Sequence, residues 1–220
     1  MKKPILPVIE KVEEIKEIQV PEKAITISNV PFTSQSPFGN WKNIIYEEGC
    51  EEASITMAVY WARGIELTPE KADSEIKNIS NFEAKIYGHF LDTSVEDTAN
   101  IIKEYFSFNQ YRIIENITKA DIIKSISNGN LLLIPAYGRD LKNIFYTPPG
   151  PIAHMLVVVG YDPLTKEFIT NDPGTKNGKD FRYNEDIFYN AIWAYPTNSG
   201  DLSPPDSTTN RIKTMIEVYK

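Results

Sequence analysis

The chain has 220 residues, with 30 acidic and 23 basic side chains, a net charge of −7 and 41% hydrophobic residues. This length suits one domain with a sizeable core, and the interspersed charges leave no basic stripe, which argues against nucleic acid as a partner. A single cysteine excludes an intrachain disulfide and a multi-cysteine metal cluster, and two distant histidines do not indicate a zinc site, so we expect neither a metal nor another cofactor.

Polar, turn-forming residues predict a segment outside the domain at each end of the chain. Residues 1–24 are rich in Pro, Glu and Lys, which predicts an extended arm or linker. Residues 196–220 predict a polar loop followed by a short C-terminal element at 212–219, whose type the sequence leaves open. We expect the folded, functional domain at residues 25–195.

The sequence predicts no membrane-spanning segment. Its longest apolar run, residues 131–136, is far shorter than the about 20 residues that a spanning helix needs. The first residues carry the positive charge of a signal peptide but lack its apolar segment. We expect an extracellular or cell-surface location, with the export signal absent from this chain, and a cytoplasmic location is the open alternative. The oligomeric state is not predicted.

The first half of the domain predicts four helices. Gly49 precedes the first of them, and Gly64 is suited to end it in a left-handed conformation. Thr68, Ser94 and Thr118 are suited to cap the next three, because their hydroxyls can accept hydrogen bonds from free backbone N–H groups.

The second half predicts antiparallel strands. Residues 131–137, 154–161 and 167–170 are apolar runs, and a Pro-containing turn at 162–165 joins the last two into a hairpin. Residues 184–193 predict a last helix. Helices followed by antiparallel strands indicate an α+β domain.

Cys50 stands at the start of the first predicted helix, where free backbone N–H groups and the helix dipole favour a reactive thiolate. The two residues that follow it, Glu51 and Glu52, act in the opposite direction, because a nearby like charge disfavours ionisation. We therefore expect Cys50 to depend on pairing with an imidazolium more than on the helix dipole.

Three other residues complete a candidate catalytic set with Cys50. His154 begins one strand of the hairpin and Asp172 follows its partner strand, so the two lie at the same edge of the sheet. An imidazole can deprotonate the thiol, and a carboxylate can hold the useful tautomer of the ring. Gln35 could donate to the developing oxyanion together with the backbone N–H of Cys50.

The motifs around these residues resemble those of the C39-like cysteine peptidases, a group within the papain-like superfamily. Residues 30–35 (VPFTSQ), Trp41 and residues 49–54 (GCEEAS) are similar to the opening of that group, and residues 154–162 (HMLVVVGYD) and 171–173 (NDP) are similar to its histidine strand and Asp-Pro element. The resemblance covers about residues 29–195. It implies a papain-like α+β fold in which the nucleophile helix packs on an antiparallel sheet, with the roles given above for Cys50, His154, Asp172 and Gln35.

Three aromatic or imidazole side chains are candidates for substrate contact. Trp41 could form a wall of the cleft, His89 could line it, and Tyr146 lies in an aromatic loop at 143–150 that could cover it. The alternatives are ordinary core packing for Trp41, a plain loop histidine, and a rigid connector.

The sequence thus predicts a cysteine peptidase that hydrolyses a peptide or amide bond of a peptide or protein substrate through a thioester intermediate. Replacing Asp172 by Asn is expected to slow it less than losing Cys50. One alternative is a non-catalytic module of the same fold that binds a peptide or cell-wall fragment. Another is a cell-wall amidase of the NlpC/P60 type, although these usually orient the base with a second histidine.

Overall fold

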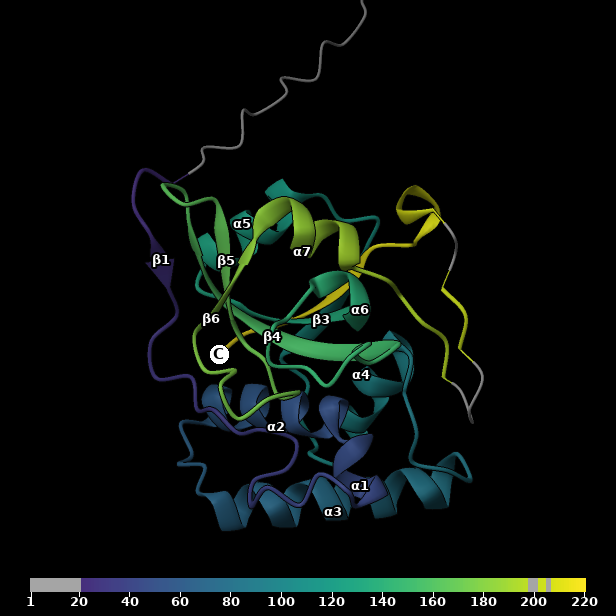
Figure 1. Ribbon diagram of the computed structural model, residues 1–220. Coiled ribbons are helices and arrows are strands. Elements are labelled where there is room, and N and C mark those ends of the chain that lie inside the picture. The colour runs from purple at the N-terminus through teal and green to yellow at the C-terminus, as the bar shows by residue number, and fades with distance from the viewer. Residues whose placement is uncertain (1–20, 198–201, 205–206) are drawn as a thin grey trace, which may run out of the picture.

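The computed structural model describes residues 21–197, 202–204 and 207–220, so the predicted arm at 1–24 lies outside it except for the last four positions. The fold is α+β, as the sequence predicts: an antiparallel sheet with helices on both faces (Figure 1). The elements, in chain order, are β1 (Ile25–Thr26), α1 (Ile44–Glu47), α2 (Cys50–Arg63), α3 (Pro69–Ile86), α4 (Val95–Glu104), β2 (Tyr111–Glu115), α5 (Lys119–Ser127), β3 (Leu131–Tyr137), α6 (Gly138–Leu141), β4 (Ala153–Asp162), β5 (Glu167–Asn171), β6 (Phe181–Asn184), α7 (Glu185–Ala191), the 3-10 helix η1 (Thr208–Asn210) and β7 (Thr214–Val218).

The sheet is built around the predicted hairpin of β4 and β5. Its strand order is β2-β7-β3-β4-β5-β6, and β1 pairs with the far end of β4. In the hairpin register Val157 lies opposite Asn171, so the chain leaves β5 beside the first residues of β4. The start of β4 and the residue that follows β5 therefore lie at one edge of the sheet.

Helix α2 is the central helix of the fold. Every residue from Cys50 to Trp61 is buried, because α2 lies between the sheet and α3 (Figure 1). Gly64 ends the helix with a φ of 65°, the left-handed conformation that glycine adopts without steric cost.

The predicted caps of the next three helices are confirmed. Thr68, Ser94 and Thr118 each accept a hydrogen bond from a backbone N–H in the first turn. Thr118 forms a capping box with Asp121, in which each side chain bonds the other residue's backbone N–H. Helices α2 and α3 lie below the sheet in Figure 1, and α5 and α7 lie above it.

Several strands were not predicted, and the description of the first half as helical is incomplete for that reason. The two-residue β1 and the edge strand β2 lie in that half, and β2 has a mixed burial pattern rather than an apolar run. β6 is a four-residue strand at the opposite edge. The C-terminal element of undetermined type is β7, a fully buried strand between β2 and β3.

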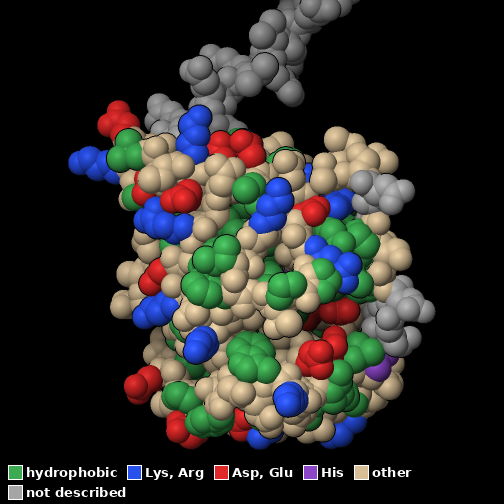
Figure 2. Space-filling model, in the orientation of Figure 1, with side chains coloured by type: hydrophobic (Ala, Val, Ile, Leu, Met, Phe, Trp, Pro, Cys, Tyr) green, Lys and Arg blue, Asp and Glu red, His purple; other side chains and the backbone are tan. Residues whose placement is uncertain are grey.

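The surface carries charges of both signs. Acidic and basic side chains are interspersed over the face shown in Figure 2, between scattered hydrophobic ones. None of the described helices has the length and hydropathy to span a bilayer.

Candidate active site

Cys50 is the first residue of α2 and directly follows the N-cap position, Gly49. Its side chain is only 4% exposed, but it lines a cavity of about 850 Å³. Within the described residues no acceptor bonds the backbone N–H of Cys50, as is usual in the first turn of a helix. One turn later the hydroxyl of Ser54 donates to the carbonyl of Met155 at 3.1 Å, which fixes this end of α2 beside His154.

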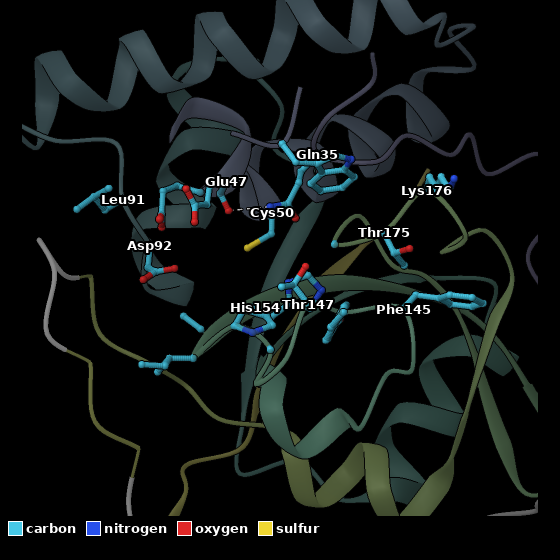
Figure 3. Close-up of a pocket in the computed structure, with 18 of the residues that line it drawn as sticks. Gln35, Glu47, Cys50, Leu91, Asp92, Phe145, Thr147, His154, Thr175 and Lys176 are labelled. Atoms are coloured by element: carbon cyan, nitrogen blue, oxygen red, sulfur yellow. Dashed lines mark hydrogen bonds between the residues drawn. The ribbon is translucent and has the colours of Figure 1, made fainter. Parts of the chain in front are cut away.

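His154 stands near the start of β4 and lines the same cavity; in Figure 3 the sulfur of Cys50 points into the space above the ring. Its Nε2 lies 2.8 Å from Oδ1 of Asp172. Because an ionised carboxylate can only accept, Nε2 carries the ring proton and Nδ1 is the basic nitrogen. The hairpin therefore places the imidazole beside the carboxylate, as the sequence predicts.

Asp172 is fully buried and accepts hydrogen bonds from several segments of the chain. Its Oδ1 also accepts from the backbone N–H of Gly174 at 2.9 Å. Its Oδ2 accepts from Nδ2 of Asn143 at 3.0 Å and from the hydroxyls of Tyr146 and Tyr183. Burial alone would raise the pKa of Asp172, but the adjacent imidazole and the two hydroxyls outweigh burial and hold the pKa below its ordinary value. The carboxylate is thus ionised at neutral pH and fixes the ring.

Gly174 allows the loop after β5 to pass close to the imidazole. A Cβ at this position would lie 2.9 Å from Cε1 of His154 and 3.0 Å from Cε1 of Tyr146, a distance too short for carbon atoms. The ring of Tyr146 packs edge-on against the imidazole, with 5.4 Å between the centroids. The ring of His154 is therefore confined by packing as well as by its hydrogen bond.

Gln35 also lines the cavity, in the loop before α1. Its backbone N–H donates to the carbonyl of Pro173, which ties this loop to the residue after Asp172. Its side-chain Nε2 donates to the carbonyls of Tyr46 and Glu47, at 2.9 and 2.8 Å. Both amide hydrogens are engaged in this arrangement, so the donation to an oxyanion that the sequence predicts requires one of them to be released.

Two of the three predicted substrate-contact residues line the cavity, and the third does not. Trp41 and Tyr146 line the cavity, whereas His89 does not. Nδ1 of His89 instead accepts from the backbone N–H of Leu91 at 3.3 Å, as a plain loop histidine would. The loop at 143–150 is bonded to the acid through Asn143 and Tyr146, which favours the rigid connector over a movable cover.

The thiol lies in acidic surroundings. Burial raises the pKa of Cys50 well above its ordinary value, and the charges of Glu51 and Asp92 raise it further. Burial together with Glu51 and Glu48 raises the pKa of Asp92 to about 8. Within the described ranges, no group of three or more His, Cys, Asp and Glu residues is arranged to hold a metal ion.

Two more buried carboxyls lie behind the nucleophile. Glu52 accepts from the hydroxyl of Ser80 at 3.0 Å, and Oε1 of Glu83 has no hydrogen-bond partner among the described residues. Burial, with the charge of Glu51, raises the pKa of Glu83 to about 9. Burial and the charge of Glu83 likewise raise the pKa of Glu52 well above its usual range. With its pKa near 9, Glu83 is protonated at neutral pH.

These raised pKa values predict that the protein loses stability between pH 5 and pH 8. In that window the unfolded chain releases the proton of Glu83, whose ordinary pKa is about 4.3, while the folded protein keeps it. We expect the midpoint of thermal unfolding to fall by roughly 5 °C over this range, measured by intrinsic fluorescence.

The variant Glu83→Gln keeps the shape and removes the titration, so its midpoint should change distinctly less with pH. The matched control is Glu104→Gln, on the exposed end of α4, which should follow the wild type. A Glu83→Gln profile as steep as that of the wild type would contradict the assignment.

Sequence reasoning missed the residues that hold the acid and the base. Asn143 and Tyr183 bond Asp172 from positions 29 and 11 residues away, and neither stands in a motif. The only signal in the sequence is the aromatic loop before His154, which predicts substrate contact rather than a bond to Asp172.

Comparison with known proteins finds a matching family and similar solved structures. The model of the Peptidase_C39 like family matches residues 27–200. A search of curated proteins found no match. Among solved structures, the chain is similar to the crystal structure of a Bacillus anthracis protein assigned to the C39-like peptidases, with 17% identity and a TM-score of 0.52, over 90% of this chain and 99% of that one. At this identity the likeness concerns the fold.

Proposed function

Because the chain belongs to the Peptidase C39-like family, we propose that it is a cysteine peptidase that hydrolyses peptide or amide bonds. The observation that carries this proposal is the buried His154–Asp172 pair on the wall of the cavity that also contains Cys50. A nucleophile, a base and a group that orients the base are the components that acyl transfer from an amide to water requires.

The proposed reaction uses these groups in two halves. Nδ1 of His154 takes the thiol proton as the sulfur of Cys50 attacks the substrate carbonyl, and the imidazolium then gives that proton to the leaving amine. The thioester that remains is attacked by water, whose proton passes to the same Nδ1. The acid is released, and the proton returns to the sulfur. Asp172 stays ionised and stabilises the imidazolium in both halves.

The developing oxyanion needs hydrogen-bond donors. The backbone N–H of Cys50 is available for this role, because no acceptor bonds it among the described residues. We propose Gln35 as the second donor, with one of its amide hydrogens moving from a backbone carbonyl to the oxyanion. The lost hydrogen bond would cost about 1 kcal/mol, which a charged acceptor can offset.

An alkylation experiment tests the roles of the thiol and the base. Labelling of Cys50 by iodoacetamide, followed by intact mass below pH 7, should be at least about tenfold slower in His154→Ala than in the wild type, because the imidazolium no longer stabilises the thiolate. Peptide products from casein, identified by mass spectrometry, should appear with the wild type and not with His154→Ala.

The chain offers a matched control in its only other histidine. His89→Ala should label at the wild-type rate, since this side chain lies outside the cavity. Equal, slow labelling of all three proteins without casein products would instead favour the non-catalytic binding module.

A further inference from the structure

The thiol of Cys50 has a second possible partner, which the proposed mechanism does not use. Its sulfur lies 2.9 Å from Oε2 of Glu51, the next residue of α2. The other oxygen of this carboxylate, Oε1, accepts from the hydroxyl of Tyr195 at 2.7 Å and from the backbone N–H of Thr93 at 3.3 Å. Two segments far apart in the sequence thus hold Glu51 against the nucleophile.

Glu51 is deeply buried, at 1% exposure, and its neighbours do not neutralise it. Among the described residues, no Lys or Arg forms an ion pair with it. Its charge is balanced by hydrogen bonds alone, and the thiol is one of the three donors. Such a bond to an ionised acceptor is stronger than a neutral one, so the thiol is held at this carboxylate.

The groups around the pair come from six segments. Most are acidic; among the described residues, the basic side chains that line the cavity are His154 and Lys176. By element they are Glu52 on α2, Glu48 before α2, Glu83 on α3, Asp92 between α3 and α4, Tyr195 after α7, and His154 on β4.

We propose that Glu51 is a positioning residue, which holds the Cys50 thiol protonated in the resting enzyme until the proton passes to His154 during attack. The inference rests on the proposed peptidase function, because it describes the resting state of that site. The proton leaves the sulfur for Nδ1 of His154, so that a thiolate and an imidazolium form together. A free thiolate beside the Glu51 carboxylate would be repelled, so the reactive anion exists only while the imidazolium is present.

This arrangement makes the resting nucleophile slow to react with other electrophiles. The sulfur is an uncharged thiol at neutral pH, and thiols react far more slowly than thiolates with alkylating agents and oxidants. Burial of the side chain acts in the same direction. The dipole of α2, which alone would favour the thiolate, is opposed by a full charge in direct contact with the sulfur.

The test is the pH dependence of Cys50 alkylation by iodoacetamide, followed by intact mass, in the wild type and in Glu51→Gln. Glutamine keeps the size and the hydrogen-bond acceptor but removes the charge. We expect the midpoint of the alkylation profile to move down by at least about one pH unit, which corresponds to about tenfold faster labelling on its acidic limb. A purely structural role would change the unfolding temperature and leave this midpoint in place.

Glu52→Gln is the matched control. Glu52 is the next residue of the same helix and equally buried, but it bonds Ser80 rather than the sulfur. Its profile should overlay that of the wild type. If Glu51→Gln fails to fold, Tyr195→Phe replaces it. Loss of this donor loosens the hold on the Glu51 carboxylate at the sulfur and should move the midpoint in the same direction by a smaller step.

An unchanged or raised midpoint in Glu51→Gln, or in Tyr195→Phe where that variant is needed, overturns the proposal. The readout needs no turnover, so it separates the two claims. A lowered midpoint in a protein that cleaves no casein would refute the peptidase function and leave the role of Glu51 intact. Casein cleavage together with an unchanged midpoint would support the peptidase function and refute the role of Glu51.

Discussion

Replacing Cys50 by alanine is expected to abolish peptide hydrolysis, with a loss of at least about 10⁴-fold, while the fold is retained. The sulfur atom forms the bond to the substrate, and no other cysteine is present to replace it. Alanine suits the first turn of a helix. Removing the sulfur also removes a donor to the buried Glu51 carboxylate, so the free energy of unfolding should fall by about 1–3 kcal/mol.

Casein cleavage, read by mass spectrometry, measures the first effect, and thermal unfolding measures the second. Cys50→Ser is the matched variant, because it keeps nearly the same shape with a far weaker nucleophile, and it should be almost as inactive. Turnover by Cys50→Ala above about 1% of the wild-type rate would remove the assignment of Cys50 as nucleophile.

Replacing Asp172 by asparagine is expected to cost roughly 10³-fold to 10⁴-fold in kcat, less than the loss of Cys50 but more than a Cys-His-Asn arrangement would suggest. The reason lies in how the amide must orient. The position of Oδ2 faces three donors, namely Asn143, Tyr146 and Tyr183, whereas Oδ1 faces only the imidazole and one backbone N–H.

The amide oxygen in the Asp172→Asn variant should therefore take the Oδ2 side, which turns the NH₂ group toward Nε2 of the imidazole. Nε2 would then have to accept, so the ring proton would move to Nδ1, the nitrogen that must take the proton of the thiol. In this tautomer His154 could no longer act as the base, although the side chains would keep nearly the same positions.

Kinetics on a peptide substrate should show the loss in kcat, with KM changing much less. The amide also faces donors that it cannot all satisfy, so the free energy of unfolding should fall by about 1–3 kcal/mol. The control is Asp180→Asn, an exposed aspartate a few residues further along, which should behave as wild type. If the Asp172→Asn variant keeps a kcat within about tenfold of the wild type, its amide oxygen faces the imidazole, as in a Cys-His-Asn arrangement, and the expected orientation is wrong.

The parts of the site that the sequence predicted depend on local chemistry. The caps at Thr68, Ser94 and Thr118 are short-range signals, and the structure confirms them. The pairing of His154 with Asp172 needed one further step, because a single turn sets the register of the hairpin that joins them. Such features are visible in a sequence, since few residues separate the groups that interact.

The parts that it missed depend on contacts between distant segments. β7 lies between β2 and β3, but its own sequence does not predict which strands it pairs with. Asn143 and Tyr183 bond Asp172 only because a loop and an edge strand converge there. The sequence shows Glu51 as a charge next to the thiol. Its direct bond to the sulfur depends on Tyr195 and Thr93, which hold the carboxylate in place from outside the helix.

The position of β7 also constrains how the protein is made. A ribosome delivers the chain in order, so β3 lacks one of its two neighbours until residues 214–218 have emerged. Until then β2 and β3 present unpaired edges, which invite pairing with other nascent chains. Translation that stops short of these residues should therefore yield aggregates rather than a smaller folded protein.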